Sequence, residues 1–157
     1  EFKTIGLNKE FVQMNYAVNK RKLTFRGFHF QDIPHCETKL VTCVSGKIID
    51  TIIDIRKNSP TFLQSFSIEL SDQEPKSVII PEGFAHGYLT LKDNSCLFYL
   101  HSAYYNVGAH SGLNYKDPLL NIKFNETPKI ISEQDKSIPF LDSTFTGLDI
   151  SRILMEN

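Results

Sequence analysis

The stretch Arg26-Gly27-Phe28-His29-Phe30-Gln31 alternates aromatic and polar side chains, which predicts a β-strand with one apolar face and one polar face. Strict alternation would place Arg26 on the aromatic face and His29 on the opposite one. The two side chains can therefore reach the same ligand only if the strand twists or bulges. Gly27 lies between them, and a glycine inside a strand often marks a bulge or a close backbone approach. We expect such an irregularity here.

Similar strand signals recur along the chain at regular spacing, separated by turns rich in Gly, Pro and Asn. One of them, residues 48–56, is apolar on both faces except at Asp50 and Asp54, which predicts a central strand packed between layers. Many short strands of this kind are typical of an all-β antiparallel sandwich or barrel. The expected strands are residues 11–18, 26–31, 39–44, 48–56, 65–70, 77–80, 86–91 and 95–103.

The last third of the chain changes character and predicts helices. Residues 132–135 (SEQD) have the pattern of a helix start, with a serine cap followed by acidic residues. Residues 143–157 are expected to form a terminal helix through Leu148, Ile150, Ile153 and Leu154. The sequence shows no linker, repeat or low-complexity segment, so we expect a single domain over residues 1–157.

Composition limits the classes of function. A chain of 157 residues with 41% hydrophobic residues and 12 Phe suits one domain with a sizeable core. The formal net charge of -1 gives no footprint for nucleic acid or an anionic membrane, and no apolar run is long enough to span a bilayer. Cys36, Cys43 and Cys96 are odd in number and lack CxxC spacing, which argues against a disulfide framework or structural zinc and favours the reducing cytoplasm.

Several polar residues are candidates for chemistry, although each also has a structural explanation as a surface charge, a hydrogen-bonded core residue or a helix cap. The pair Gln13 and Asn15 shares one face of the first strand, either as a solvated edge or as two amides offered to a ligand. The other candidates are Arg26, His29, Lys39, His86, Tyr99, Tyr105 and Asp135.

The spacing of these residues favours chemistry without a cofactor. His29 and His35 lie six residues apart and His86 stands alone, so a cupin metal site with a close His-x-His pair is not expected. Phosphate-loop and nucleophile-elbow motifs are also missing from the sequence. A histidine held by an aspartate makes a base near neutral pH, a tyrosine can return a proton, and Arg and Lys can hold a diphosphate or an enolate oxygen. Such a set suits proton abstraction beside a ketone.

The motifs taken together resemble those of the dTDP-4-dehydrorhamnose 3,5-epimerase family, which acts in nucleotide-sugar biosynthesis. They occur in the family's order and cover about residues 10–142. The matching segments are 26–31 (RGFHFQ), 39–41 (KLV), 44–46 (VSG), 54–62 (DIRKNSPTF), 80–88 (IPEGFAHGY), 104–105 (YY) and 132–135 (SEQD). The resemblance implies a cupin, or jelly-roll, fold and a homodimer in which strands of one subunit complete the pocket of the other. It also leads us to expect that the family's N-terminal segment, with a Phe-x-Asp-x-Arg-Gly pattern, is missing here.

The resemblance also implies a role for each candidate residue. His29 matches the general base, Asp135 the carboxylate paired with it, and Tyr99 the acid across the sugar ring. Lys39 matches the lysine near the developing enolate, with His86 close by. Contacts to the diphosphate or nucleotide are implied for Arg26, Gln13, Asn15 and Tyr105.

The implied reaction inverts C3 and C5 of a nucleotide-linked 4-keto-6-deoxyhexose through enolates, with neither metal nor organic cofactor. A variant that inverts one centre remains open. Two different functions also remain open: a 3,4-ketoisomerase acting on a related substrate, and a non-catalytic cupin that binds a nucleotide sugar.

Overall fold

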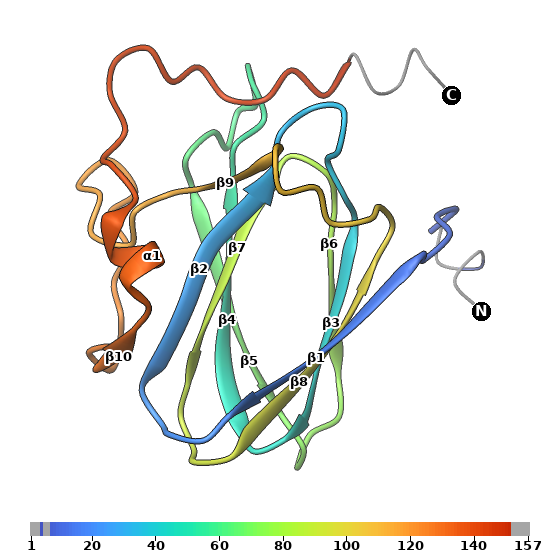
Figure 1. Cartoon of the computed structure of the whole chain (residues 1–157), viewed down its shortest axis with the longest axis vertical. Helices are drawn as coiled ribbons and strands as arrows, with labels where there is room; N and C mark the ends of the chain where they lie inside the picture. The colour runs from blue at the N-terminus through green and yellow to red at the C-terminus, as the bar shows by residue number, and fades with distance from the viewer. Residues whose placement is uncertain (1–3, 5–6, 152–157) are drawn as a thin grey trace.

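The computed structural model describes Thr4 and residues 7–151, and its strands form two sheets that face each other (Figure 1). The four-stranded sheet has the order β1 (Gln13–Asn19), β8 (Ser95–His101), β3 (Lys39–Ser45) and β6 (Ser77–Ile80). The larger sheet has the order β10 (Ile130–Ile131), β2 (Thr24–Gln31), β7 (Phe84–Thr90), β4 (Lys47–Asp54) and β5 (Ser65–Ser71), and β9 (His110–Gly112) also pairs with β2. All the pairings are antiparallel except that of β10 with β2. The all-β sandwich prediction is confirmed.

The bulge expected in β2 is present. Arg26 pairs with Tyr88 and His29 pairs with His86, so three steps along β2 match two steps along β7. Gly27 between them has φ +136°, a conformation that L side chains rarely adopt. The extra residue brings Arg26 and His29 to the same side of the sheet, where both side chains line one cavity.

Two hydrophobic clusters hold the sheets in place. The inner cluster lies between the sheets and contains Val41, Ile48, Leu70 and Leu97 among its buried members. The outer cluster lies on the far face of the larger sheet, where residues of the C-terminal third pack against the side chains of β2, β4 and β7. Burial of one large apolar side chain stabilises a fold by about 1.5–3 kcal/mol, so both clusters are major contributions. As predicted, β4 is buried on both faces, with Asp50 and Asp54 pointing to the inner side.

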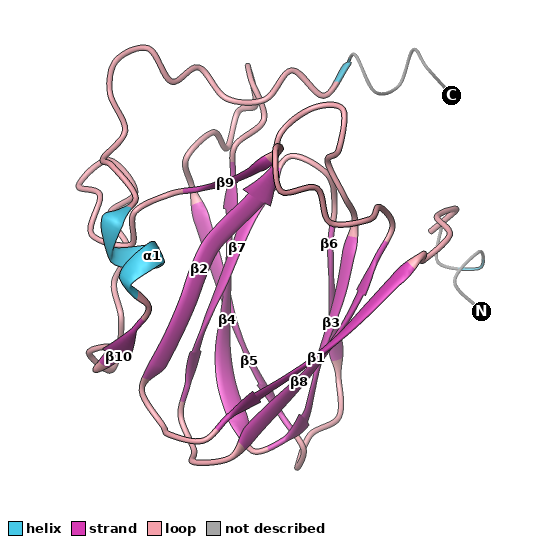
Figure 2. Ribbon diagram, viewed as in Figure 1, coloured by secondary structure: helices cyan, strands magenta, loops and turns pink. Residues whose placement is uncertain are grey.

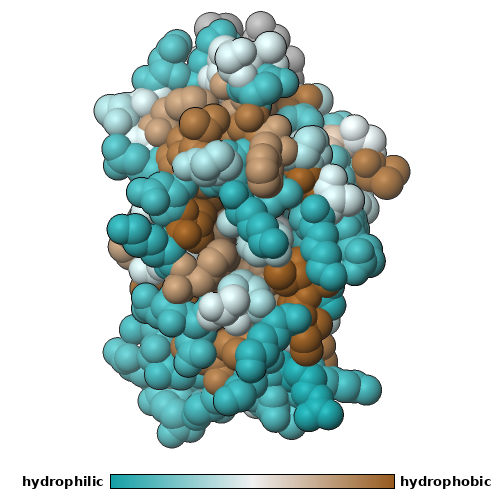
Figure 3. All heavy atoms as spheres, turned by 90° about the vertical axis from the view of Figure 1, so that its left-hand side faces the viewer, coloured by the Kyte–Doolittle hydropathy of each residue, from teal (hydrophilic) through white to brown (hydrophobic). Residues whose placement is uncertain are grey.

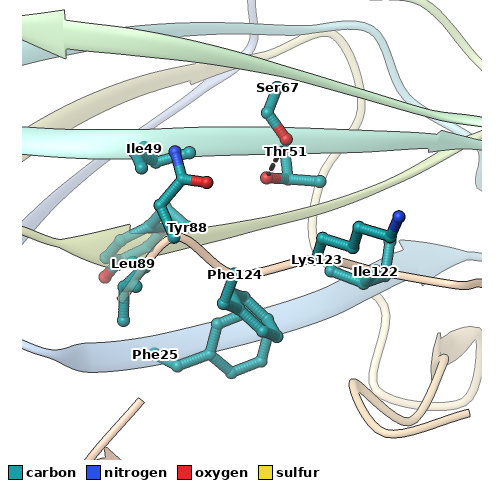
Figure 4. Close-up of a pocket in the computed structure, with 10 residues that line it drawn as sticks. Phe25, Ile49, Thr51, Ser67, Tyr88, Leu89, Ile122, Lys123 and Phe124 are labelled. Carbon is teal, nitrogen blue, oxygen red and sulfur yellow. Dashed lines mark hydrogen bonds between the residues drawn. The ribbon is translucent and has the colours of Figure 1, made fainter. Parts of the chain in front are cut away.

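A small cavity of about 140 Å³ lies at the edge of the outer cluster, where the segment containing Phe124 crosses the larger sheet (Figure 4). Figure 4 shows Phe124 beside Phe25, and the hydroxyls of Thr51 and Ser67 joined by a hydrogen bond of 2.8 Å. The lining contains neither a histidine nor a carboxylate. This cavity is a gap in the packing of the covering segment and lacks the histidine–carboxylate pairs found between the sheets.

The C-terminal third is mostly loop (Figure 2). The helix predicted to start at Ser132 is confirmed as α1 (Glu133–Ser137), with the Ser132 side chain accepting from the backbone N–H of Asp135. The terminal helix is wrong for residues 143–150, and the part of it at 152–157 lies outside the described residues. Leu148 instead pairs with Arg56 in a parallel bridge and exchanges backbone hydrogen bonds with Ile55 and Lys57. Phe145 and Leu148 of this segment are thus partly buried against the outer cluster.

The face covered by α1, β10 and this segment is largely hydrophilic, with hydrophobic atoms showing in patches between the polar ones (Figure 3). The helix α1 spans only five residues, and no helix within the described residues is long or apolar enough to cross a membrane.

Candidate active site

Two adjoining cavities open between the sheets, of about 260 Å³ and about 150 Å³. We call the larger one the inner cavity and the smaller one the outer cavity. Both sheets contribute side chains to each. The inner cavity is lined by Asn15, Arg26, His29, Lys39, His86, Tyr88, Tyr99 and His101. The outer cavity is lined by Gln13, Asn15, His29, Phe30, Gln31, Glu37, Lys39, His101, Tyr105 and His110.

The predicted pairing of His29 with Asp135 is present: His29 Nε2 lies 2.7 Å from Asp135 Oδ1, across 106 positions of sequence. The Asp135 side chain is only 2% exposed, whereas that of His29 is 31% exposed and lines both cavities. Burial alone would raise the pKa of Asp135, but hydrogen bonds from His29, Ser132 and the Gly27 backbone lower it below its ordinary value. Asp135 is therefore a carboxylate that orients the imidazole through Nε2. The ring nitrogen that does not contact Asp135 is Nδ1.

His86 belongs to a second histidine–carboxylate pair. Its Nε2 lies 2.7 Å from Asp50 Oδ2 inside the barrel, and both residues are buried. Asp50 comes from β4 and His86 from β7, which are neighbours in the larger sheet. The pair fixes the imidazole ring against the inner cavity, so His86 is both a hydrogen-bonded barrel residue and part of the cavity wall.

Tyr99 faces these histidines from the opposite sheet. Its ring centroid lies 6.0 Å from that of His86 and 6.3 Å from that of Tyr88. Burial, the neighbouring Tyr88 and a hydrogen bond with it raise the pKa of Tyr99 well above its ordinary value. Tyr99 is thus a neutral phenol at neutral pH and carries a proton that it can donate.

Lys39 lies on β3 and lines both cavities. Its Nζ is 3.1 Å from Glu37 Oε1, and the other oxygen of Glu37 accepts a hydrogen bond from His101 Nδ1 at 3.1 Å. All three side chains are about nine-tenths buried or more. The cation is therefore held by a carboxylate at the cavity wall and is not a surface charge.

The remaining predicted residues lie around the outer cavity, apart from Arg26, which is exposed and lines only the inner one. Gln13 donates through Nε2 to Asn15 and accepts through Oε1 from the Tyr105 backbone at 2.8 Å, so the amide pair supports the loop that carries Tyr105. The Tyr105 ring is exposed and lies 5.6 Å from that of His110.

Five titratable residues of the site were not proposed from the sequence: Glu37, Asp50, Tyr88, His101 and His110. Three of them carried a usable signal. Tyr88 and His101 stand two residues after His86 and Tyr99, on the same strand face, and Asp50 is a polar residue inside an apolar strand. Glu37 and His110 lie close to loops, where no periodicity indicates which way a side chain points.

His110 contacts the predicted base directly. Its ring centroid is 5.1 Å from that of His29, and its pKa is lowered by burial and by the charges of His29 and Lys39. The neutral ring accepts a hydrogen bond from the amide of Gln134 at 3.2 Å. Within the described residues, no group of three or more His, Cys, Asp or Glu side chains is placed to hold a metal ion.

A sequence model for the family described as dTDP-4-dehydrorhamnose 3,5-epimerase matches residues 1–143. The chain belongs to this family. Its members are epimerases, a class of isomerase. The chain is 38% identical over 147 residues to the dTDP-4-dehydrorhamnose 3,5-epimerase of Mycobacterium tuberculosis, and the match covers 91% of this chain and 72% of that protein.

Solved structures of the epimerase family share the fold. The Bacillus anthracis epimerase, solved with TDP and PPi bound, superposes with a TM-score of 0.87 and 37% identity over 89% of this chain and 80% of its own. The Legionella pneumophila epimerase, solved with dTDP-4-keto-L-rhamnose, gives a TM-score of 0.85 and 29% identity over 94% of this chain and 79% of its own. The two-sheet architecture around the cavities is thus that of the epimerase family.

Proposed function

We propose that this protein inverts C3 and C5 of a nucleotide-linked 4-keto-6-deoxyhexose. The observation that carries the proposal is the placement of acid and base on opposite walls of one cavity. His29, oriented by Asp135, comes from the larger sheet, and Tyr99 comes from the smaller one. Inversion needs a proton to leave one face of a carbon and another to arrive on the other face, and this arrangement supplies a group for each.

In the proposed step, His29 takes the proton from the carbon beside the C4 ketone. The electrons of the C–H bond form the enolate double bond, and the negative charge moves to O4. Lys39 stabilises that oxygen with its charge, and His86 lies close by on the same cavity. Tyr99 then delivers its proton to the opposite face of the carbon, and exchange with solvent returns His29 and Tyr99 to their starting states. General acid and base groups of this kind typically contribute about 10²–10⁴-fold in rate.

The nucleotide end is proposed to occupy the outer cavity. Arg26 offers a guanidinium to the diphosphate from the adjoining inner cavity, while Gln13 and Asn15 offer amides from the outer cavity. Tyr105 offers an exposed ring on which a base can stack. The relatives solved with TDP or dTDP-4-keto-L-rhamnose support a nucleotide sugar as the ligand.

The experiment is solvent exchange in D₂O with a TDP-linked 4-keto-6-deoxyhexose, followed by NMR at C3 and C5. Deuterium at both positions, with a changed configuration, is the expected result. Deuterium at one position would assign inversion of a single centre. A carbonyl that moves to C3 would indicate a 3,4-ketoisomerase, and no exchange with tight binding would indicate a binding protein.

We further propose that the protein is a homodimer of single-domain subunits in the cytoplasm. The outer face of the four-stranded sheet supports the dimer, because Met14, Tyr16 and Val18 project from β1 with more than half of each side chain exposed. They adjoin Leu100 and Phe98 of β8, which continue the apolar surface. The three cysteines are unpaired, in keeping with a reducing compartment.

A further inference from the structure

His101 lines both cavities, and one nitrogen of its ring is buried without a hydrogen-bond partner. The residue is 9% exposed and lies on β8, two positions after Tyr99, with the two ring centroids 6.1 Å apart. Its Nε2 atom is buried and finds no hydrogen-bond partner among the described residues. A buried polar atom without a partner is costly in a folded protein, so an unpaired one on a residue that lines two cavities points to a ligand.

The other nitrogen of the ring is fixed by Glu37. Glu37 Oε2 accepts from His101 Nδ1 at 3.1 Å and from Gln31 Nε2 at 3.2 Å, and Glu37 Oε1 lies 3.1 Å from Lys39 Nζ. Burial alone would raise the pKa of Glu37, but the hydrogen bond from His101 and the charge of Lys39 lower it below its ordinary value. Glu37 is therefore a carboxylate, which can only accept, so Nδ1 of His101 must carry a proton.

This assignment decides what Nε2 can bind. When Nδ1 carries the only ring proton, Nε2 has a free lone pair and accepts hydrogen bonds. The phosphate and keto oxygens of a nucleotide-linked keto sugar only accept, whereas the ring hydroxyls donate. A ring hydroxyl is therefore the matching group at the inner wall, beside Tyr99.

We propose that His101, oriented by Glu37, is a substrate-binding residue that accepts a hydrogen bond from a ring hydroxyl of the sugar. The residue would thus help to select the sugar, separately from recognition of the nucleotide. This inference rests on the proposed function, because it takes a nucleotide sugar as the occupant of the two cavities.

The test compares TDP with TDP-linked glucose by titration calorimetry on the wild-type protein and two variants. His101→Phe keeps a ring of similar size but removes the acceptor, and His101→Gln restores a side-chain oxygen. We expect His101→Phe to weaken binding of TDP-glucose about tenfold, the effect of losing one hydrogen bond, while binding of TDP changes less than twofold. His101→Gln should recover part of the loss. Thermal melting of each variant checks that it is folded.

Three results would overturn the inference, each in a distinct way. Equal weakening for TDP and TDP-glucose would show that His101 binds the phosphates as a cation. Unchanged binding of both probes would show that Nε2 contacts no ligand. If the wild-type protein binds neither probe, the proposed function fails, and this inference fails with it.

An independent measurement needs only the wild-type protein. Nitrogen-15 NMR distinguishes the two neutral tautomers of a histidine, and the His101 signals are assigned by their loss in His101→Phe. We expect the tautomer with the proton on Nδ1. A signal from the tautomer with the proton on Nε2 would overturn the role of Glu37 as the positioning residue.

Discussion

The imidazole of His29 is the residue on which the proposed chemistry depends, and its orientation is set from outside its own strand. Asp135 is almost fully buried and holds Nε2 at 2.7 Å, so the ring cannot turn without breaking this contact. A buried carboxylate beside an imidazole favours the protonated ring that forms after proton abstraction. The pairing therefore suits a base that must accept a proton beside a ketone.

We expect His29→Ala to lower solvent exchange at C3 and C5 by about 10²–10⁴-fold, because it removes the general base while leaving the cavity open. The measurement is the rate of deuterium incorporation with saturating substrate. His35→Ala is the control, since His35 contacts Asn106 and lines neither cavity between the sheets. Exchange at the wild-type rate in His29→Ala would mean that another residue is the base.

Tyr99→Phe should separate the two halves of the reaction. The variant keeps the ring but removes the hydroxyl that delivers the second proton, so inversion should slow more than exchange. Both rates come from one D₂O experiment, in which deuterium incorporation and product configuration are followed together. Equal slowing of the two would contradict the assignment of Tyr99 as the acid.

At the scale of elements, the bulge in β2 decides which side chains meet. Without the extra residue, Arg26 would point to the outer cluster and His29 alone would reach the cavity. Gly27 permits the bulge because it has no Cβ atom. A Cβ atom at this position would lie 2.5 Å from Cα of Gly87 and 3.0 Å from the carbonyl oxygen of His86, which is too close.

Gly27→Ala should therefore lower the free energy of unfolding by about 3 kcal/mol, through the clash with β7 and through the strain of φ +136°. Urea denaturation measures the change. Gly108→Ala is the matched control: an added Cβ would meet only Asn106 Oδ1, at 3.3 Å, and we expect a loss below about 1 kcal/mol. A Gly27→Ala protein as stable as the wild type would show that the strand accommodates a side chain there.

At the scale of the whole molecule, the two faces of the four-stranded sheet have different tasks. The inner face carries Asn15, Lys39 and Tyr99 toward the cavities, while the outer face exposes apolar side chains of β1. An apolar sheet face left open to water is typical of a surface that another chain covers.

We expect light scattering to give a mass of about 36 kDa, twice the 18.0 kDa of one chain. Tyr16→Glu places a charge on the outer face of β1 and should shift the protein to a monomer. Ser67→Glu puts the same charge on the exposed face of β5, in the other sheet, and should leave the mass unchanged. A wild-type protein of 18 kDa would contradict the dimer.

Patterns between neighbouring residues were enough to predict much of this fold. The alternation in residues 26–31, the turns between short strands and the cap at Ser132 each depend on geometry within a few residues, and all three predictions are confirmed. Residues 143–150 show the limit of this reasoning. Their apolar spacing suggested a helix, but Leu148 pairs with Arg56 in a β-bridge, and Phe145 and Leu148 pack partly buried against the outer cluster instead.

The sequence by itself determined the fold class, the strand positions and the membership of His29, Asp135, Tyr99 and Lys39 in one candidate set. Only the tertiary structure decided how these groups are paired. Contacts across 36, 64 and 106 positions depend on strand register and on the course of the C-terminal segment, which no local pattern encodes. That is why the Asp50–His86 and Glu37–His101 pairs appear only in the folded protein, where two sheets bring distant side chains to one cavity.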